Sequence, residues 1–187
     1  MKRHSHIRHL VGAAIVAAGA IAGPLAPAID AHAEGPDLTK IQVPAGNKQF
    51  FAAHATGVQI YSCNANGTSF NWVLLAPRAN LYDDKGRIVA THFGGPTWKA
   101  NDGSSVVGKK VDGVTVDPTA IQWLLIAGDS WTVGAEGDRL ANTTFVQRLR
   151  TTGGLAPRPE TCTATSVGNT EEVAYTADYT FWKKTGA

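Results

Sequence analysis

The sequence has 187 residues, of which 43% are hydrophobic and 17% charged, and this is enough for one globular domain with a substantial core. Its 17 basic and 15 acidic side chains give a formal net charge of +2, and no block of like charge occurs after residue 33. This balance argues against nucleic acid or an anionic membrane surface as the main partner. No linker or internal repeat indicates a second domain.

The first 33 residues have the pattern of a removable export signal. A positively charged start, residues 2–8, precedes an uncharged apolar run, residues 10–22, that is too short for a stable transmembrane anchor. Ala31-His32-Ala33 then supplies the small residues that a signal peptidase recognises. We therefore expect cleavage before Glu34, a secreted or otherwise extracytoplasmic protein of residues 34–187, and no transmembrane anchor after cleavage.

Loss of this segment changes the composition available for function. It removes three of the 17 basic and one of the 15 acidic side chains, which leaves 14 of each in the mature chain. It also removes four of the six histidines, so His54 and His92 alone remain for acid–base or metal chemistry. That scarcity limits the catalytic and metal sites that the mature protein can build.

Short apolar or alternating segments, separated by turns, follow along the mature chain. Residues 58–63 alternate as a half-buried strand does, and residues 70–76 form an apolar run that predicts a core strand ended by Pro77. Residues 120–127 are the most apolar segment and predict a central strand. The other expected strands are 87–93, 104–111, 140–152 and 173–182.

The segment 173–182 has the clearest strand pattern of all. Its apolar face consists of Val173, Tyr175, Ala177, Tyr179 and Phe181. The other face is polar, so one side is expected to pack on the core while the other meets water. No helical periodicity of similar length occurs in the mature chain, and glycines and prolines punctuate the short strands. The sequence therefore predicts an all-β single domain, either a β-sandwich or a closed barrel.

The two cysteines are expected to form a disulfide. Cys63 and Cys162 both lie in the mature part, and an exported protein meets an oxidising compartment. Neither has a neighbouring histidine or a CxxC partner that would lower the pKa of its thiol. A Cys63–Cys162 bridge would therefore stabilise the fold rather than form a reactive site.

The segment 92–105 has the densest collection of residues with functional chemistry. Two glycines and a proline fix a tight backbone path directly after a strand, and a histidine, a tryptophan, an aspartate and two serines lie around them. Functional loops on rigid β scaffolds have this composition. Structural corners have it too, with a buried histidine donating to a carbonyl and an aspartate capping a turn.

Short motifs recur in a specific order over nearly the whole mature chain. They are 57–63 (GVQIYSC), Trp72, 76–77 (AP), 92–98 (HFGGPTW), 102–104 (DGS), 121–125 (IQWLL), 147–148 (QR), 151–154 (TTGG), 156–157 (AP), Cys162 and 175–179 (YTADY). This ordered set resembles the secreted bacterial and fungal family catalogued as domain of unknown function 3455. One departure is Gln122, where the family commonly has proline.

The resemblance implies an exported, all-β domain on a shared scaffold. It implies no activity, because the family has no established one. Some fungal relatives carry a dehydrogenase label, but this chain lacks the GxGxxG strand-turn-helix that binds a dinucleotide. We therefore expect no cofactor.

A hydrolase is one chemical hypothesis for the segment 92–105. His92 as base, Asp102 as the residue that orients it and Ser104 or Ser105 as nucleophile are the right residue types for acyl transfer. The GxSxG nucleophile elbow is absent, and Asp102-Gly103-Ser104 is also an ordinary turn sequence. A metal centre is the weaker hypothesis, because two histidines are too few for a copper–zinc pair, and we assign no metal ligand.

A binding module is the other hypothesis, carried by tryptophans. Trp98 and Trp131 lie beside turns, where a partly exposed indole can offer a flat face to a carbohydrate or a small apolar ligand. Trp72 and Trp123 lie inside apolar runs and are expected in the core. We therefore expect an exported, non-catalytic binding domain, with a hydrolase using His92, Asp102 and Ser104 as the alternative.

The arginines of the segment 139–150 are assigned to the surface. Arg148 and Arg150, with Arg139 nearby, predict a solvated strand face or ion-pair partners for Asp178 rather than an anion site.

Overall fold

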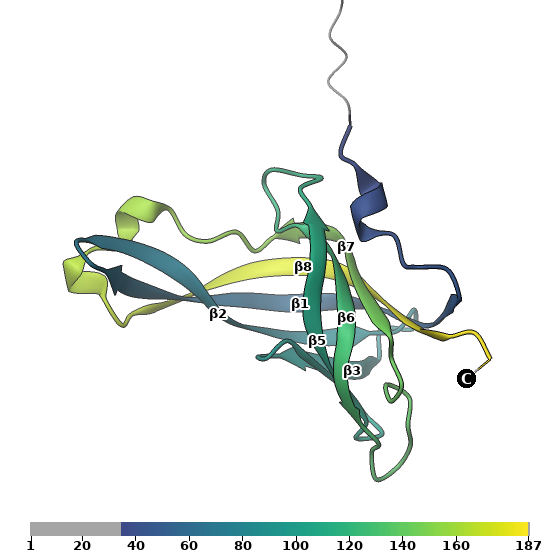
Figure 1. Cartoon of the computed structure of the whole chain (residues 1–187). Helices are drawn as coiled ribbons and strands as arrows, with labels where there is room; N and C mark the ends of the chain where they lie inside the picture. Colours follow the sequence, from purple (N-terminus) through teal and green to yellow (C-terminus); the bar gives the residue numbers. More distant parts are fainter. Residues whose placement is uncertain (1–34, 187) are drawn as a thin grey trace, which may run out of the picture. The chain divides into compact units, whose positions relative to one another are not determined.

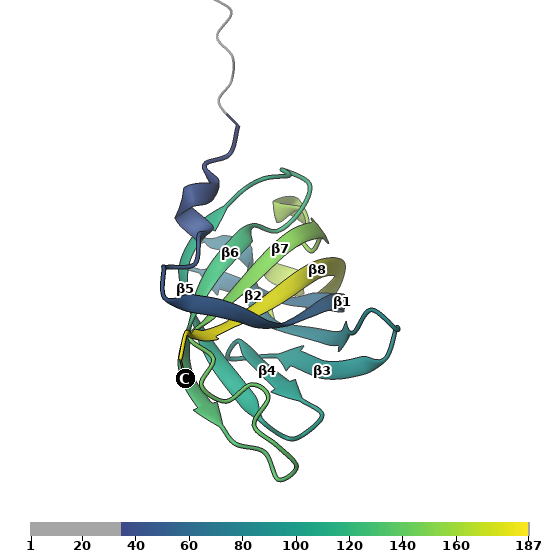
Figure 2. The same ribbon diagram turned by 90° about the vertical axis from the view of Figure 1, so that its right-hand side faces the viewer.

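The computed structural model describes residues 35–186, so the predicted signal sequence lies outside the described residues. These residues form eight antiparallel strands in which each strand pairs with its neighbour in sequence, and β1 pairs with β8 to close a barrel (Figures 1 and 2). The all-β prediction is confirmed, and of the two architectures expected the barrel is the one formed. The strands are β1 (Asn47–Asn66), β2 (Ser69–Tyr82), β3 (Ile88–Phe93), β4 (Thr97–Ala100), β5 (Ser105–Val114), β6 (Trp123–Thr132), β7 (Phe145–Gly153) and β8 (Thr170–Lys184).

The described part of the chain also has three short 3-10 helices, one before β1 and two between β7 and β8. They are η1 (Leu38–Ile41), η2 (Pro159–Thr161) and η3 (Ala164–Ser166). Within residues 35–186, no helix has both the length and the apolar character needed to cross a membrane.

The barrel interior is filled by the alternate residues that point inward from each strand. On β8, the face predicted to be apolar is the inner one, and Tyr175, Ala177, Tyr179 and Phe181 are all buried. Small alanines on the neighbouring strands make room for these rings, and Trp98 of β4 packs edge-on against Tyr179 and Phe181. In a barrel of this size, the inward-pointing side chains are large enough to fill the interior.

A second apolar cluster lies on the outer face of β5 and β6. Ile41 of η1 packs there with Val114 and Leu125, and Trp123 borders the cluster. Because Trp123 and Leu125 are two residues apart on β6, they share a face that points away from the barrel interior. Trp123 is therefore half-buried outside the main core, where the sequence placed it inside.

The segment 70–76 is a strand, but it is not a core strand and Pro77 does not end it. β2 continues through Pro77 to Tyr82, and Leu75 forms a bulge because it has no partner on β1. Leu74 and Leu75 are 49% and 64% exposed. β1 and β2 extend at this end as a hairpin beyond the other strands (Figure 1).

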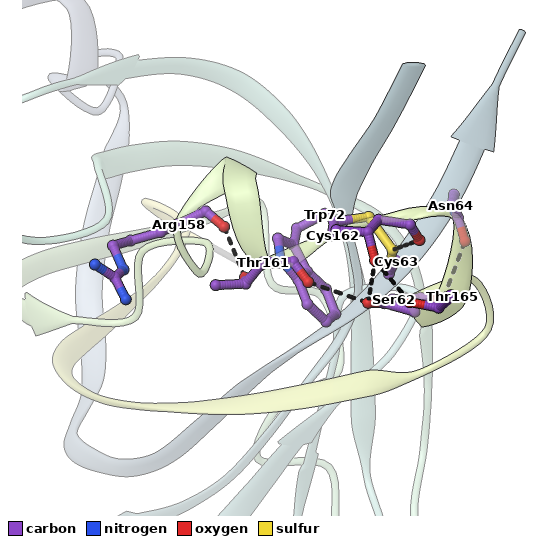
Figure 3. The surroundings of a disulfide bond; sticks show 10 residues. Ser62, Cys63, Asn64, Trp72, Arg158, Thr161, Cys162 and Thr165 are labelled. Carbon is purple, nitrogen blue, oxygen red and sulfur yellow. Dashed lines mark hydrogen bonds between the residues drawn. A yellow bond between two sulfur atoms is a disulfide. The ribbon is translucent and has the colours of Figure 1, made fainter. Parts of the chain in front are cut away.

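The predicted disulfide between Cys63 and Cys162 is confirmed. It joins the extended part of β1 to the end of η2, across 99 residues of sequence. Figure 3 shows Trp72 beside the bridge, and its indole Nε1 donates to Thr161 Oγ1 at 2.9 Å. Trp72 is thus half-buried on the hairpin rather than in the core, since the hairpin extends past the barrel.

Candidate functional site

A pocket of about 460 Å³ lies at one end of the barrel interior. Its walls come from six of the eight strands and from the loops after β3, β5 and β7. The apolar lining residues are Leu74, Leu75, Pro77, Pro96, Ile121, Leu124 and Leu155, and the polar ones are Gln59, His92, Lys110, Gln122 and Arg148. The pocket therefore combines a largely apolar wall with a few hydrogen-bonding groups, as sites for small organic molecules do.

Gln59 is the most unusual of the polar lining residues. It lies on the inner face of β1, opposite Pro77, and only 2% of its surface is exposed. Its amide nitrogen Nε2 is buried and finds no hydrogen-bond partner among the described residues. A buried donor without an acceptor costs about 1–3 kcal/mol, so this group lowers the stability of the fold where it stands.

His92 lies on the inner face of β3 and is 3% exposed. Its Nδ1 is 2.9 Å from the carbonyl oxygen of Thr97 and must donate, because a carbonyl can only accept. This tautomer leaves Nε2 as an acceptor. The ring stacks on Trp98 with 4.3 Å between centroids.

The environment of His92 keeps its imidazole neutral. Burial lowers the pKa of His92 from 6.5 to about 3, the hydrogen bond to Thr97 opposes this shift, and the charge of Arg148 adds to it. His92 therefore serves the pocket as a neutral, polarisable ring near neutral pH rather than as a cation.

Arg148 lies on the inner side of β7, where it is half-buried. Its Nε donates to the backbone carbonyl of Gln122 at 3.0 Å, which fixes the guanidinium in the pocket wall. Within residues 35–186 no carboxylate forms a salt bridge with it. The assignment of Arg148 to a solvated face is therefore wrong, whereas Arg150 does pair with Asp178 as predicted.

A β-bulge in β7 explains why the side chains of these two arginines point to opposite sides of the strand. In a regular strand, Arg148 and Arg150 would share a face, because side chains alternate with a period of two. The pairing of β7 with β8 shifts register between Leu149 and Thr152, and Arg150 adopts a positive φ of 46°. The bulge turns Arg150 outward to Asp178 and leaves Arg148 facing the interior.

The three residues of the hydrolase hypothesis do not meet as a triad. Asp102 and Ser104 are together: Ser104 Oγ donates to Asp102 Oδ1 at 2.5 Å, and Ser104 is fully buried. His92 instead bonds to Thr97, because it pairs with Trp98 at the start of β4 while Asp102 lies in the turn after β4. Catalysis by these residues stays a prediction.

Asp102 organises the turn that follows β4. Its two carboxylate oxygens accept hydrogen bonds from the backbone N–H groups of Ser104 and Arg139 at 2.9 Å each, as well as from the Ser104 hydroxyl. Ser104 Oγ in turn accepts from the backbone N–H of Leu140 at 3.0 Å. Burial raises the pKa of Asp102, but the hydrogen bonds from Ser104 and Arg139 together outweigh it and hold the pKa below its ordinary value.

Replacing Asp102 with alanine is expected to lower the free energy of unfolding by about 2–3 kcal/mol, because the backbone N–H and the hydroxyl of the buried Ser104 lose their acceptor, as does the backbone N–H of Arg139. Urea unfolding at pH 7 measures this, with Asp84→Ala as the control, since Asp84 is an exposed aspartate in another turn. Equal stability of Asp102→Ala and wild type would contradict the structural role and favour a functional one.

The two tryptophans proposed to bind ligand lie in different environments. The expected partial exposure of Trp98 is wrong: it is 1% exposed, because the short strand β4 directs it inward onto His92. Trp131 is 47% exposed and borders a second pocket, of about 540 Å³, together with Asn142 and Thr144. Trp131 thus keeps the exposed indole face that a sugar ring would need.

The residues that sequence reasoning missed are Gln59 and Arg148. Gln59 shares one face of β1 with Tyr61 and Cys63, so the period of two along a strand could have predicted its inward position. The position of Arg148 could not be predicted in this way, since its separation from Arg150 depends on a bulge that leaves no clear sequence signal. In the described part of the chain, no three His, Cys, Asp or Glu side chains gather as a metal site requires.

Fold and pocket together define a closed antiparallel β-barrel protein with a partly polar pocket at one end of its interior. The chain belongs to the family described as protein of unknown function (DUF3455), whose family model matches residues 44–183 and so spans all eight strands almost completely. The resemblance expected from the motif order is thereby confirmed. Neither the curated proteins nor the solved structures contain a match to this chain.

Proposed function

We propose that the protein is a non-catalytic binding domain that holds a small amphipathic molecule in the barrel-end pocket. The observation that carries this proposal is the unsatisfied amide nitrogen of Gln59 inside a largely apolar cavity. A fold that keeps a buried donor without an acceptor is less stable than it could be, and a ligand oxygen would supply the missing acceptor.

The remaining lining fits the same role. Leu74, Leu75 and Leu155 are 49%, 64% and 42% exposed and lie at the rim, so they offer apolar contact to a molecule that enters the barrel. Covering such side chains gains about 25 cal/mol for each Å² of apolar surface removed from water. His92 contributes a neutral ring to the pocket lining.

We also propose that this binding takes place outside the cytoplasm. The Cys63–Cys162 disulfide is consistent with an oxidising compartment, and the pattern of residues 1–33 is that of an export signal. The hydrolase alternative is a separate hypothesis that requires a movement of His92 toward Ser104.

Saturable binding of a neutral apolar probe tests the proposal. N-phenyl-1-naphthylamine should bind wild type with one-site saturation and increased fluorescence, because it can replace water on the leucine rim. In the double variant Leu74→Ser/Leu75→Ser the probe should bind about tenfold more weakly, since two apolar contacts are lost. Fluorescence titration measures both dissociation constants.

The matched control is Val133→Ser. Val133 is 64% exposed, as Leu75 is, but does not line the pocket. Affinity in this variant should equal that of wild type. Linear, non-saturating fluorescence, or an equal loss in the control, would overturn the proposed function.

A further inference from the structure

We propose that the barrel-end pocket selects an apolar molecule bearing a carboxylate, with Arg148 and Gln59 binding the carboxylate and the leucine rim covering the apolar part. This inference rests on the proposed function and adds the chemical class of the ligand.

The charge of the pocket lining is the first step. Arg148 and Lys110 both line the cavity, and no aspartate or glutamate does so in the described part of the chain. Lys110 Nζ donates to Gln122 Oε1 at 3.1 Å, which is a neutral partner. Two positive charges therefore face a partly apolar cavity without a compensating carboxylate.

Two acidic residues on the neighbouring strand β8 are engaged elsewhere. Asp178 of β8 binds Arg150 and His54, and its outward position follows from the burial of Ala177 and Tyr179 on either side. Glu172, also on β8, pairs with Arg78 at 2.6 Å on the exposed surface. Neither acid is available to Arg148.

The polar groups beside Arg148 inside the barrel are also uncharged. Burial raises the pKa of Tyr175. The neighbouring Tyr179 raises it further through its charge and a hydrogen bond, in which the two hydroxyl oxygens are 3.5 Å apart. Burial likewise raises the pKa of Tyr179, against the opposing charge of Arg148. Both phenols are therefore neutral at pH 7. A half-buried cation among neutral groups is costly unless an anion joins it.

The free donors match one carboxylate. A guanidinium has five N–H groups, of which the Nε–H of Arg148 is used by Gln122 and one other lies within reach of the Tyr179 hydroxyl. The remaining N–H groups can bind both oxygens of a carboxylate, and charge-assisted pairs of this kind are about twice as strong as neutral hydrogen bonds. Nε2 of Gln59, which has no partner among residues 35–186, supplies a further donor.

Calorimetric titration of the mature protein with decanoate, decanol and decyltrimethylammonium tests the charge selection. Decanoate should bind at least tenfold more tightly than decanol, because both offer the same chain and only the acid meets the unpaired arginine. The cationic analogue should bind more weakly than decanol. The preference should decrease as salt rises, since part of it is electrostatic.

Two variants assign the effect to the named residues. Arg148→Gln should weaken decanoate binding about tenfold to a hundredfold and leave decanol unchanged, whereas Arg148→Lys, which keeps the charge, should retain part of the preference. The control Arg78→Gln removes an exposed arginine outside the pocket and should change neither affinity.

Gln59→Met adds a readout besides affinity. It should weaken decanoate binding about fivefold, while stability in urea stays equal or rises, because an unsatisfied buried donor is removed. Equal binding of decanoate and decanol, or an equal loss of both in Arg148→Gln, would overturn this inference. Continued binding of the naphthylamine would then leave the proposed function intact. Absence of binding by the naphthylamine, decanoate and decanol alike would overturn both.

Discussion

Removing the Cys63–Cys162 disulfide is expected to lower the free energy of unfolding by about 4–5 kcal/mol. The bridge closes a loop with a sequence separation of 99, and a cross-link over such a loop removes a large part of the conformational freedom of the unfolded chain. The loop includes β2 to β7, so nearly the whole barrel lies between the two cysteines. Urea unfolding of the double variant Cys63→Ala/Cys162→Ala against oxidised wild type measures the difference.

The double variant is preferable to a single one because it leaves no free thiol. Wild type unfolded in the presence of a reductant should lose nearly as much stability as the double variant, since both lack the cross-link. Both cysteines are nearly buried, so packing changes add to the loss in the variant alone. A loss under about 1 kcal/mol in both experiments would show that the bridge orders only the η2 segment and the hairpin beside it.

The strands of this barrel could be predicted from local patterns, but its closure could not. The alternation of Tyr175, Ala177, Tyr179 and Phe181 predicts both β8 and the face that it buries. Whether such strands close or form two sheets depends on the pairing of β1 with β8, which joins Asn47 to Lys184 although they are far apart in the sequence. No short-range pattern encodes that register, and the sandwich therefore stayed open as an alternative.

The candidate site was harder to predict because its residues depend on irregularities of the strands. The bulge at Leu75 allows β2 to run through Pro77, and the register shift after Leu149 separates Arg148 from Arg150. A regular β7 would place Arg150 on the same face as Arg148. Part of the site thus depends on positions where the simple period of two fails.

The segment 92–105 was misleading for a different reason. Its residue types indicate a catalytic site, but its geometry does not bring those residues together. His92 lies on β3, opposite the start of β4, whereas Asp102 and Ser104 lie in the turn beyond the end of β4. The aspartate and serine form a hydrogen-bonded corner, and the histidine belongs to the pocket. Closeness in sequence therefore grouped residues that serve two different parts of the barrel.

Acidification from pH 7 to pH 4.5 is expected to destabilise the protein by about 3 kcal/mol through His92 alone. The pKa of His92 is about 3 in the folded protein, and in the unfolded chain it has its ordinary value of 6.5. Between these two pH values, only the unfolded chain takes up a proton on His92. The unfolded state then binds more protons, and stability is complete above pH 6.5 and falls as the pH drops toward 3. Each pH unit in this window corresponds to about 1.4 kcal/mol.

Urea unfolding of wild type and His92→Gln between pH 7 and pH 4.5 isolates this contribution. Glutamine can still donate a hydrogen bond to the Thr97 carbonyl but takes up no proton, so the variant should lose less stability than wild type on acidification. The aspartates, whose titration is common to both proteins, cancel in the difference. Parallel curves would mean that the folded barrel accepts a proton on His92, which is incompatible with a desolvated imidazole beside the cation of Arg148. The difference between the two curves therefore tests whether His92 is desolvated in the folded barrel, since burial is the largest cause of its lowered pKa.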